Sequence, residues 1–141
     1  MTLPRIALAA VAAIAIPLAA MAADADRSAI LKRYADLARA ADSGFAGFSA
    51  ARGETLYRTT WAGSDARTPS CMSCHTSDPK QPGRNAKTGR PIDPAAVSVN
   101  PQRYTDLTEV EKHFARDCKS VLGRDCTPQE RGDYLTFMIG Q

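Results

Sequence analysis

The chain has 141 residues, with 18 Lys and Arg against 15 Asp and Glu, and a formal net charge of +3 at pH 7. This length predicts one domain with one modest core. So small a positive charge argues against a nucleic-acid-binding protein, because the binding faces of such proteins usually carry strong basic patches.

The first segment has the three parts of a secretory signal peptide. Arg5 supplies a positive start, Ile6–Ala20 is an apolar run, and the tripeptide at 20–22 is a small-x-small cleavage site. The alternative is a membrane anchor, but the run has about 15 residues, fewer than the ~20 that span a bilayer. We predict that residues 1–22 are removed on export to the periplasm. Residues 23–141 would then form one domain with no stable membrane span.

Two helices are expected in the first part of that domain. In Arg27–Asp42, apolar side chains recur at i, i+3 and i+4 spacing, which is typical of an amphipathic helix. A second helix is expected over Ser49–Thr60, where Ser49 can cap the first turn. Gly53 inside this helix costs roughly 1 kcal/mol relative to alanine, and close approach of another helix would explain its presence.

The middle of the chain, from Trp61 to Thr105, is predicted to be loop because six prolines and three glycines interrupt it. A loop this long is unusual in a compact domain unless something orders it. A third helix is expected from Leu107 to near Cys118, with Asp106 and Glu109 forming a capping box.

A last helix is expected to open at Thr127-Pro128-Gln129-Glu130, a capping box with proline at the first helical position. Together these patterns predict an all-α protein of about four helices. No stretch is a convincing strand, and the loops between the helices are long and irregular.

The motif CMSCH, Cys71–His75, carries the clearest chemistry. Two cysteines separated by two residues can form thioether bonds to both vinyl groups of one haem, and the next histidine can ligate the iron. We therefore expect one haem c, attached covalently through Cys71 and Cys74, with His75 as the proximal iron ligand. The long loops would wrap around this cofactor.

Two other interpretations of the motif fit the sequence less well. A zinc site would combine it with Cys118, Cys126 or His113 as a further ligand, but adjacent Cys and His suit one tetrahedron poorly. A thioredoxin-like dithiol needs a strand-to-helix context, whereas proline and loop flank this segment.

The haem motif leaves Cys118 and Cys126 for each other. A disulfide over so short a loop would contribute roughly 2–3 kcal/mol by loop entropy. The alternative is two free thiols, which an oxidising compartment disfavours.

The sixth position of the iron is the open question in the sequence. Many small c-type cytochromes place a methionine there, but no methionine occurs from Thr76 to Phe137. Met72 lies inside the motif, too close to reach the opposite face, and Met138 is expected in the core. A methionine ligand is therefore not expected.

Two residues of the third helix remain as candidates. His113 and Asp117 are four residues apart and share one helical face. The imidazole would give a low-spin iron, whereas a carboxylate is a weak ligand that can let go on reduction. Alternatively, His113 is a surface residue beside Lys112, and Asp117 faces solvent or pairs with Arg116 or Arg124.

The stretch from Thr68 to Leu135 resembles a known family. "TPSCMSCHTSDPKQPGRNAKTGRPI", "NPQRYTDLTEVEKHF" and "CKSVLGRDCTPQERGDYL" are similar to the sphaeroides haem protein family of exported, monohaem, high-spin c-type cytochromes. That family is related to cytochrome c-double-prime, whose distal histidine leaves the iron on reduction.

The resemblance implies a class I cytochrome c-like fold, His75 as proximal ligand and a Cys118–Cys126 disulfide. It also implies a distal ligand immediately before the first disulfide cysteine, where the family has asparagine or histidine and this chain has Asp117. We favour Asp117 as distal ligand or gate beside a labile or open site, with His113 as the alternative.

The expected function is electron transfer with a weakly ligated, exchangeable distal site. The resemblance implies a redox partner cytochrome, possibly a dihaem cytochrome c, and diatomic ligands such as oxygen or nitric oxide. One alternative is a small haem oxidase or reductase acting on oxygen or nitrogen oxides. Another is a low-spin electron shuttle with His75 and His113 on the iron. An electron carrier is favoured over an enzyme.

Overall fold

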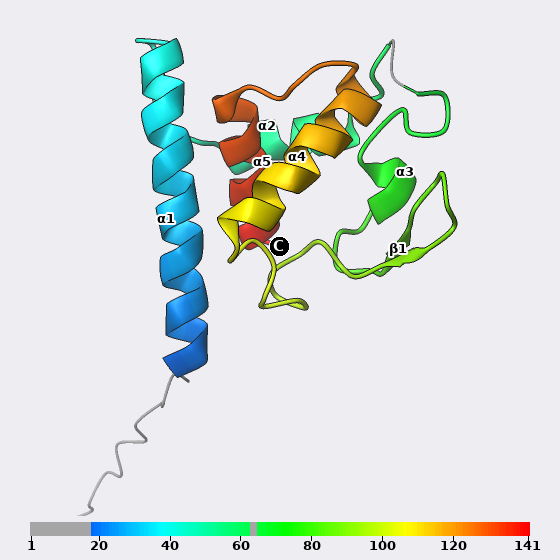
Figure 1. Ribbon diagram of the computed structural model, residues 1–141, viewed down its shortest axis with the longest axis horizontal. Helices are drawn as coiled ribbons and strands as arrows, with labels where there is room; N and C mark the ends of the chain where they lie inside the picture. Colours follow the sequence, from blue (N-terminus) through cyan, green and yellow to red (C-terminus); the bar gives the residue numbers. More distant parts are fainter. Residues whose placement is uncertain (1–17, 63–64) are drawn as a thin grey trace, which may run out of the picture.

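The structure of the protein is a computed structural model that describes residues 18–62 and 65–141. Its elements in chain order are α1 (Leu18–Ala41), α2 (Ala50–Arg58), α3 (Met72–His75), β1 (Gly83–Arg84), β2 (Pro91–Ile92), α4 (Leu107–Leu122) and α5 (Pro128–Ile139). Figure 1 shows α1 along one edge of the molecule and α3 with the β-hairpin at the other, with α2, α4 and α5 between them. The predicted all-α class is confirmed.

The helix α1 begins at Leu18, whereas the periodicity predicted a start at Arg27. Most of the predicted signal peptide, residues 1–17, lies outside the described residues, so its cleavage stays a prediction. The buried face of α1 includes Ile30, Tyr34 and Ala38, as the helical spacing predicted. Within the described ranges, no helix is both long and apolar enough to cross a membrane.

The helices α2 and α5 pack closely against each other. Ser49 caps α2 as predicted, because its side chain accepts a hydrogen bond from the Arg52 amide. A Cβ at Gly53 would collide with the backbone carbonyl of Asp133 and with Phe137. The expectation that another helix approaches this glycine is therefore confirmed.

The helix α4 is longer than predicted. The Asp106 carboxylate accepts from the amides of Thr108 and Glu109, which confirms the cap, but the Glu109 side chain pairs with Lys112 rather than completing a capping box. The helix continues to Leu122 and ends at Gly123, whose φ of 75° is left-handed and suits glycine. A glycine stop lies beyond Cys118, so the predicted end near Cys118 was wrong.

The middle of the chain is more ordered than the prediction of loop alone. α3 forms one turn within the CMSCH motif, and β1 pairs antiparallel with β2 through Gly83 and Ile92. The expectation of no strand was wrong here, although each strand has only two residues. Gly83 permits this arrangement, because a Cβ there would collide with the Cys74 carbonyl.

Candidate functional site

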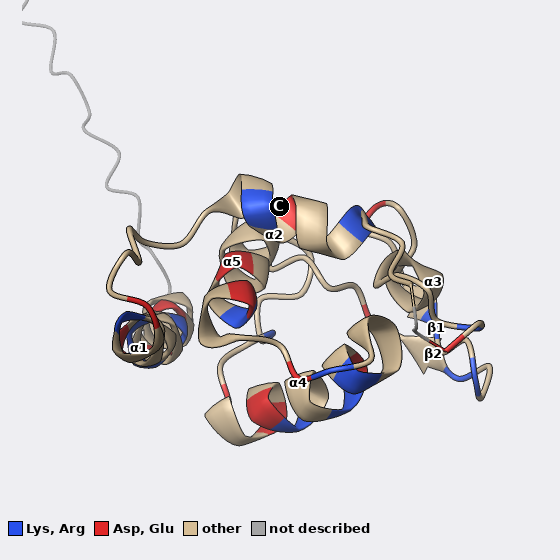
Figure 2. Cartoon of the chain, turned by 90° about the horizontal axis from the view of Figure 1, so that it is seen from above, with Lys and Arg blue, Asp and Glu red and all other residues tan. Residues whose placement is uncertain are grey.

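A cavity of about 940 Å³ lies between α4 and the segment that runs from α3 to β2. This volume is at the upper end of the range for small-molecule and cofactor sites. One wall carries Cys71, Cys74 and His75, and α4 contributes His113, Arg116 and Asp117. Figure 2 shows α4 facing the ribbon of α2 and α5, with the hairpin at one side. The structure therefore brings every predicted haem and distal-site residue to one cavity.

The two cysteines of the motif are free thiols in this structure. Burial raises the pKa of the Cys71 thiol to about 12, and the negative charge of Asp117 adds to the shift. The Cys74 sulfur accepts a hydrogen bond from the Ala86 amide at 3.4 Å. Both sulfurs line the cavity, where they can reach one bound group.

The imidazole of His75 is neutral at physiological pH. Burial lowers its pKa to about 4, and the positive charge of Arg103 acts in the same direction. The Tyr57 hydroxyl is a hydrogen-bond donor to the carbonyl oxygens of His75 and Thr76, which lie 3.1 and 2.7 Å away. This contact fixes the backbone where Thr76 takes a left-handed φ of 65°. The neutral ring keeps a lone pair that a metal can accept.

These donors fit a covalently attached haem. Two unbridged thiols and a neutral imidazole share a cavity that is also lined by the apolar side chains of Leu56, Val110 and Phe114. Over residues 18–62 and 65–141, no group of three or more His, Cys, Asp or Glu side chains is arranged to hold a metal ion. The multi-ligand cluster that a zinc site requires is therefore not assembled in that part of the chain.

The α4 wall carries a compact group of charges. Arg116 donates from Nε to Asp117 Oδ1 at 2.6 Å and from Nη2 to Asp117 Oδ2 at 3.0 Å. The same Nη2 lies 2.7 Å from Nδ1 of His113. Burial raises the pKa of the Asp117 carboxyl, but the two hydrogen bonds and the positive charge of Arg116 outweigh burial and leave the pKa below its usual value.

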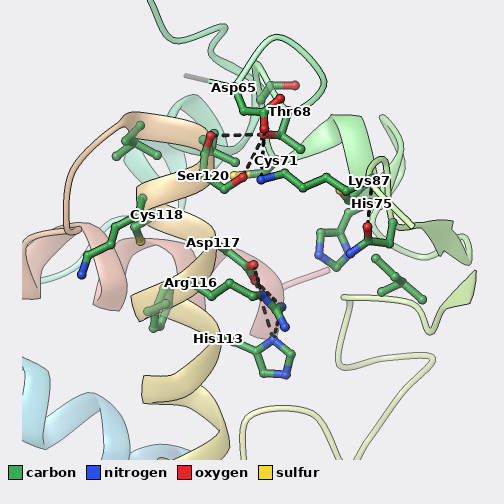
Figure 3. Close-up of a pocket in the computed structure, with 18 of the residues that line it drawn as sticks. Asp65, Thr68, Cys71, His75, Lys87, His113, Arg116, Asp117, Cys118 and Ser120 are labelled. Carbon is green, nitrogen blue, oxygen red and sulfur yellow. Dashed lines mark hydrogen bonds and ion pairs between the residues drawn. The ribbon is translucent and has the colours of Figure 1, made fainter. Parts of the chain in front are cut away.

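The pairing of Asp117 with Arg116 was one of the alternatives left open by the sequence, and the structure shows it. The side chains of His113 and Asp117 are 46% and 45% exposed. Both nevertheless line the cavity, so partial exposure does not remove either from the site. Figure 3 shows them extending from α4 toward the side where His75 lies.

The loop before α4 contributes residues that the sequence did not single out. The Arg103 side chain lines the cavity and donates to the carbonyls of Pro94 and Asp93 at 3.0 and 2.7 Å. From outside, the buried Arg27 of α1 donates to the Arg103 carbonyl at 3.1 Å. The sequence pointed to this loop only through the resemblance of "NPQRYTDLTEVEKHF" to the family.

The inner wall of the cavity is aromatic. Tyr134 of α5 lines it and has ring contacts with Tyr57, Tyr104 and Phe114 at centroid distances of 6.4, 6.2 and 5.6 Å. Met138 is fully buried, which confirms its expected core position. No methionine is among the described residues that line the cavity.

A disulfide joins Cys118 to Cys126 in the structure, with Cα atoms 5.5 Å apart. It connects the last turn of α4 to the start of α5, and both cysteines line the cavity. Asp117 precedes the bridge directly, so the covalent link restrains the backbone that carries this carboxylate.

Comparisons with known proteins agree with this geometry. Residues 43–138 match the model of a family described as a domain of unknown function, DUF1924. The cytochrome c-type protein SHP of Cereibacter sphaeroides is 45% identical over 92 residues, which are 65% of this chain and 70% of that protein. Cytochrome c″ of Methylophilus methylotrophus is 30% identical over 110 residues, 78% of this chain and 76% of that protein.

Solved structures give the same result. Oxidized SHP, described as an oxygen-binding cytochrome c, superposes with a TM-score of 0.74 at 38% identity, covering 82% of this chain and 96% of that chain. The crystal structure of oxidized cytochrome c″ gives a TM-score of 0.69 at 30% identity, covering 82% of this chain and 94% of that chain.

Fold and cavity together define a c-type cytochrome with a class I cytochrome c-like fold and one covalently bound haem c. The predicted cofactor and fold class are thereby confirmed. The chain belongs to the family of SHP and cytochrome c″ that its sequence resembled.

Proposed function

We propose that this protein is a periplasmic electron-transfer cytochrome whose distal haem site is weakly ligated and exchangeable, and accepts small ligands such as oxygen or nitric oxide. The main support is the composition of the cavity. It offers one neutral imidazole on the attachment side, no methionine among its described lining residues, and two half-exposed candidate ligands on α4.

In this proposal, Cys71 and Cys74 hold the haem and His75 is the proximal ligand. The haem supplies an iron that changes between ferric and ferrous states and can take a sixth ligand. The Tyr57 hydroxyl positions the His75 backbone, and the aromatic wall around Tyr134 keeps water from the inner face. Asp117 is the candidate distal ligand or gate, and His113 is the alternative.

The cavity also supports a site of electron entry. Its lining includes the cations Lys87, Arg90 and Arg103, and Figure 2 shows blue segments on α4 and beside the hairpin. A redox partner cytochrome, possibly a dihaem cytochrome c, would dock at this exposed edge. Oxygen binding by SHP, stated for that relative, supports the ligand-binding half of the proposal.

The testing experiment uses the haem-loaded protein from a periplasmic preparation. Its intact mass is expected to match a chain starting at Ala23 with one attached haem. The ferric absorption spectrum is expected to be high-spin, and carbon monoxide is expected to shift the reduced spectrum. A low-spin spectrum in both states, unmoved by carbon monoxide, would contradict the exchangeable site and favour the His75/His113 shuttle.

A further inference from the structure

Both candidate distal ligands contact the same side chain. The guanidinium of Arg116 makes two hydrogen bonds to the Asp117 carboxylate and one contact to the His113 ring. All three residues lie within little more than one turn of α4 and line the cavity. In Figure 3 the dashed lines from Asp117 and His113 meet at Arg116.

The contact with Arg116 fixes which His113 nitrogen carries the proton. A guanidinium can only donate hydrogen bonds and stays protonated. The Nδ1 atom, 2.7 Å from Arg116 Nη2, must therefore accept, and the proton of the neutral ring lies on Nε2. A protonated nitrogen has no lone pair for a metal, and the lone pair of Nδ1 is occupied by Arg116. Neither nitrogen of His113 is free to ligate iron in this arrangement.

The Asp117 carboxylate is held in a similar way. Each of its oxygens accepts one hydrogen bond from Arg116, which is the bidentate geometry in which arginine binds carboxylates most strongly. The positive charge of the guanidinium offsets the negative charge that would attract the carboxylate to ferric iron. Arg116 thus engages both internal candidates at once.

Three other cations of the cavity have contacts of their own. Lys87 pairs with Asp65 at 3.2 Å, and Lys119 lies 3.6 Å from Asp125. Arg103 binds backbone carbonyls of its own loop. Among the described residues, Arg116 is the only arginine or lysine whose side chain forms an ion pair with Asp117.

We propose that Arg116 is a positioning residue that acts as a latch: it holds His113 and Asp117 on α4, and so keeps the sixth position of the haem open to external ligands. This inference rests on the proposed function, because it explains how the exchangeable site stays exchangeable. Because the residues of the latch are about half-exposed, its strength is modest, and a single substitution should release it.

The test is Arg116→Leu in the full haem-loaded protein. Release of the His113 ring lets its proton move to the other nitrogen, and the ring can then occupy the iron. We expect the ferric spectrum to shift from high-spin toward low-spin. We also expect carbon monoxide to bind the reduced protein at least about tenfold more slowly, because an internal ligand must leave first. Arg116→Lys, which keeps the charge but loses the fork, should give an intermediate result.

Two controls separate the latch from a general effect of charge or folding. Lys112→Leu removes a cation from the same helix, next to His113, but Lys112 pairs with Glu109 and is outside the cavity lining. Its spectrum and carbon monoxide rate should equal those of the wild type. Arg116→Leu with His113→Ala should return the spectrum to high-spin. Far-UV circular dichroism establishes that each variant is folded.

The outcomes distinguish the two proposals. A wild-type protein that is low-spin and unmoved by carbon monoxide would overturn the exchangeable site and the latch with it. An open wild-type site with an equally open Arg116→Leu variant would overturn only the latch. The latch also fails if Lys112→Leu shifts the spectrum as much, or if His113→Ala does not restore the high-spin state.

Discussion

At the residue scale, Gly53 decides how closely α2 can approach the helix that carries Tyr134. Its missing side chain leaves room for the backbone carbonyl of Asp133 and for Phe137. The Asp133 carboxylate, which is 3% exposed, also accepts hydrogen bonds from Arg52 at 2.7 and 2.9 Å. These contacts hold α5 against α2, and so they position Tyr134 in the wall of the cavity.

Gly53→Ala sets two effects against each other. Alanine favours a helix interior by roughly 1 kcal/mol, but the new Cβ would collide with backbone, which cannot rotate away, and overpacking costs about 1–3 kcal/mol. We expect the collision to prevail and the midpoint of thermal unfolding of the haem-loaded protein to fall by several degrees. Gly140→Ala is the control, because its Cβ would meet neighbours at an ordinary 3.5 Å. A Gly53→Ala variant as stable as the wild type would refute the argument.

At the element scale, the start of α5 is fixed by local chemistry. The Thr127 side chain accepts from the Glu130 amide, and the Glu130 carboxylate accepts from the Thr127 amide, which completes the predicted capping box. Arg124 donates two further hydrogen bonds to Glu130. These bonds hold the pKa of the Glu130 carboxyl below its ordinary value, although burial opposes them.

The lowered pKa of Glu130 makes part of the stability depend on pH. The unfolded state binds this proton more readily, so the contribution is complete above the unfolded pKa, near 4.5, and is lost as pH falls through the folded pKa. We expect Glu130→Gln to lower the free energy of unfolding at pH 7 by about 1 kcal/mol. The variant should also lose less stability than the wild type between pH 5 and pH 3, measured by urea denaturation.

Glu109→Gln is the matched control for this prediction. Glu109 occupies the equivalent position in the first turn of α4, but it is exposed and pairs with Lys112. Its replacement should change the free energy of unfolding by only a few tenths of a kcal/mol. Equal pH profiles for Glu130→Gln and the wild type would show that the capping box does not carry the effect.

At the scale of the whole molecule, the haem is expected to be part of the fold. Without the haem, the apolar walls of the 940 Å³ cavity would lose the group they pack against, and lost packing in a core costs a protein several kcal/mol. A domain has only about 5–15 kcal/mol of stability. We expect a Cys71→Ala/Cys74→Ala chain produced without haem to lose most of its far-UV helical signal. Native helix content with cooperative melting would contradict this.

Features that depend on residues close together in the sequence were the ones that sequence analysis predicted. The caps at Ser49, Asp106 and Thr127 were predictable, because each depends on residues within one turn. The haem-attachment motif CMSCH is local in the same sense, and the assignment of Cys71, Cys74 and His75 to the haem stays a prediction. The end of α4 was predicted too early, near Cys118. The residue that ends the helix is Gly123, which takes a left-handed φ.

Other features were beyond sequence reasoning because they depend on which segments meet. Nothing local indicates that Arg27 binds the Arg103 carbonyl, more than 70 residues away. Arg116 was considered only as a possible partner of Asp117. Its simultaneous contact with His113 depends on side-chain conformations that spacing along a helix does not determine.

The position of Cys71 also has a consequence for the order of events during maturation. In the folded chain Cys71 is half-buried, burial raises the pKa of its thiol to about 12, and much of the cavity wall comes from α4, which follows it in the sequence. A thiol is nucleophilic as its thiolate, so the folded state is a poor substrate for thioether formation. On the predicted export, CMSCH would emerge before α4 and α5. We therefore expect haem attachment to precede the packing of α4 and α5 around the motif.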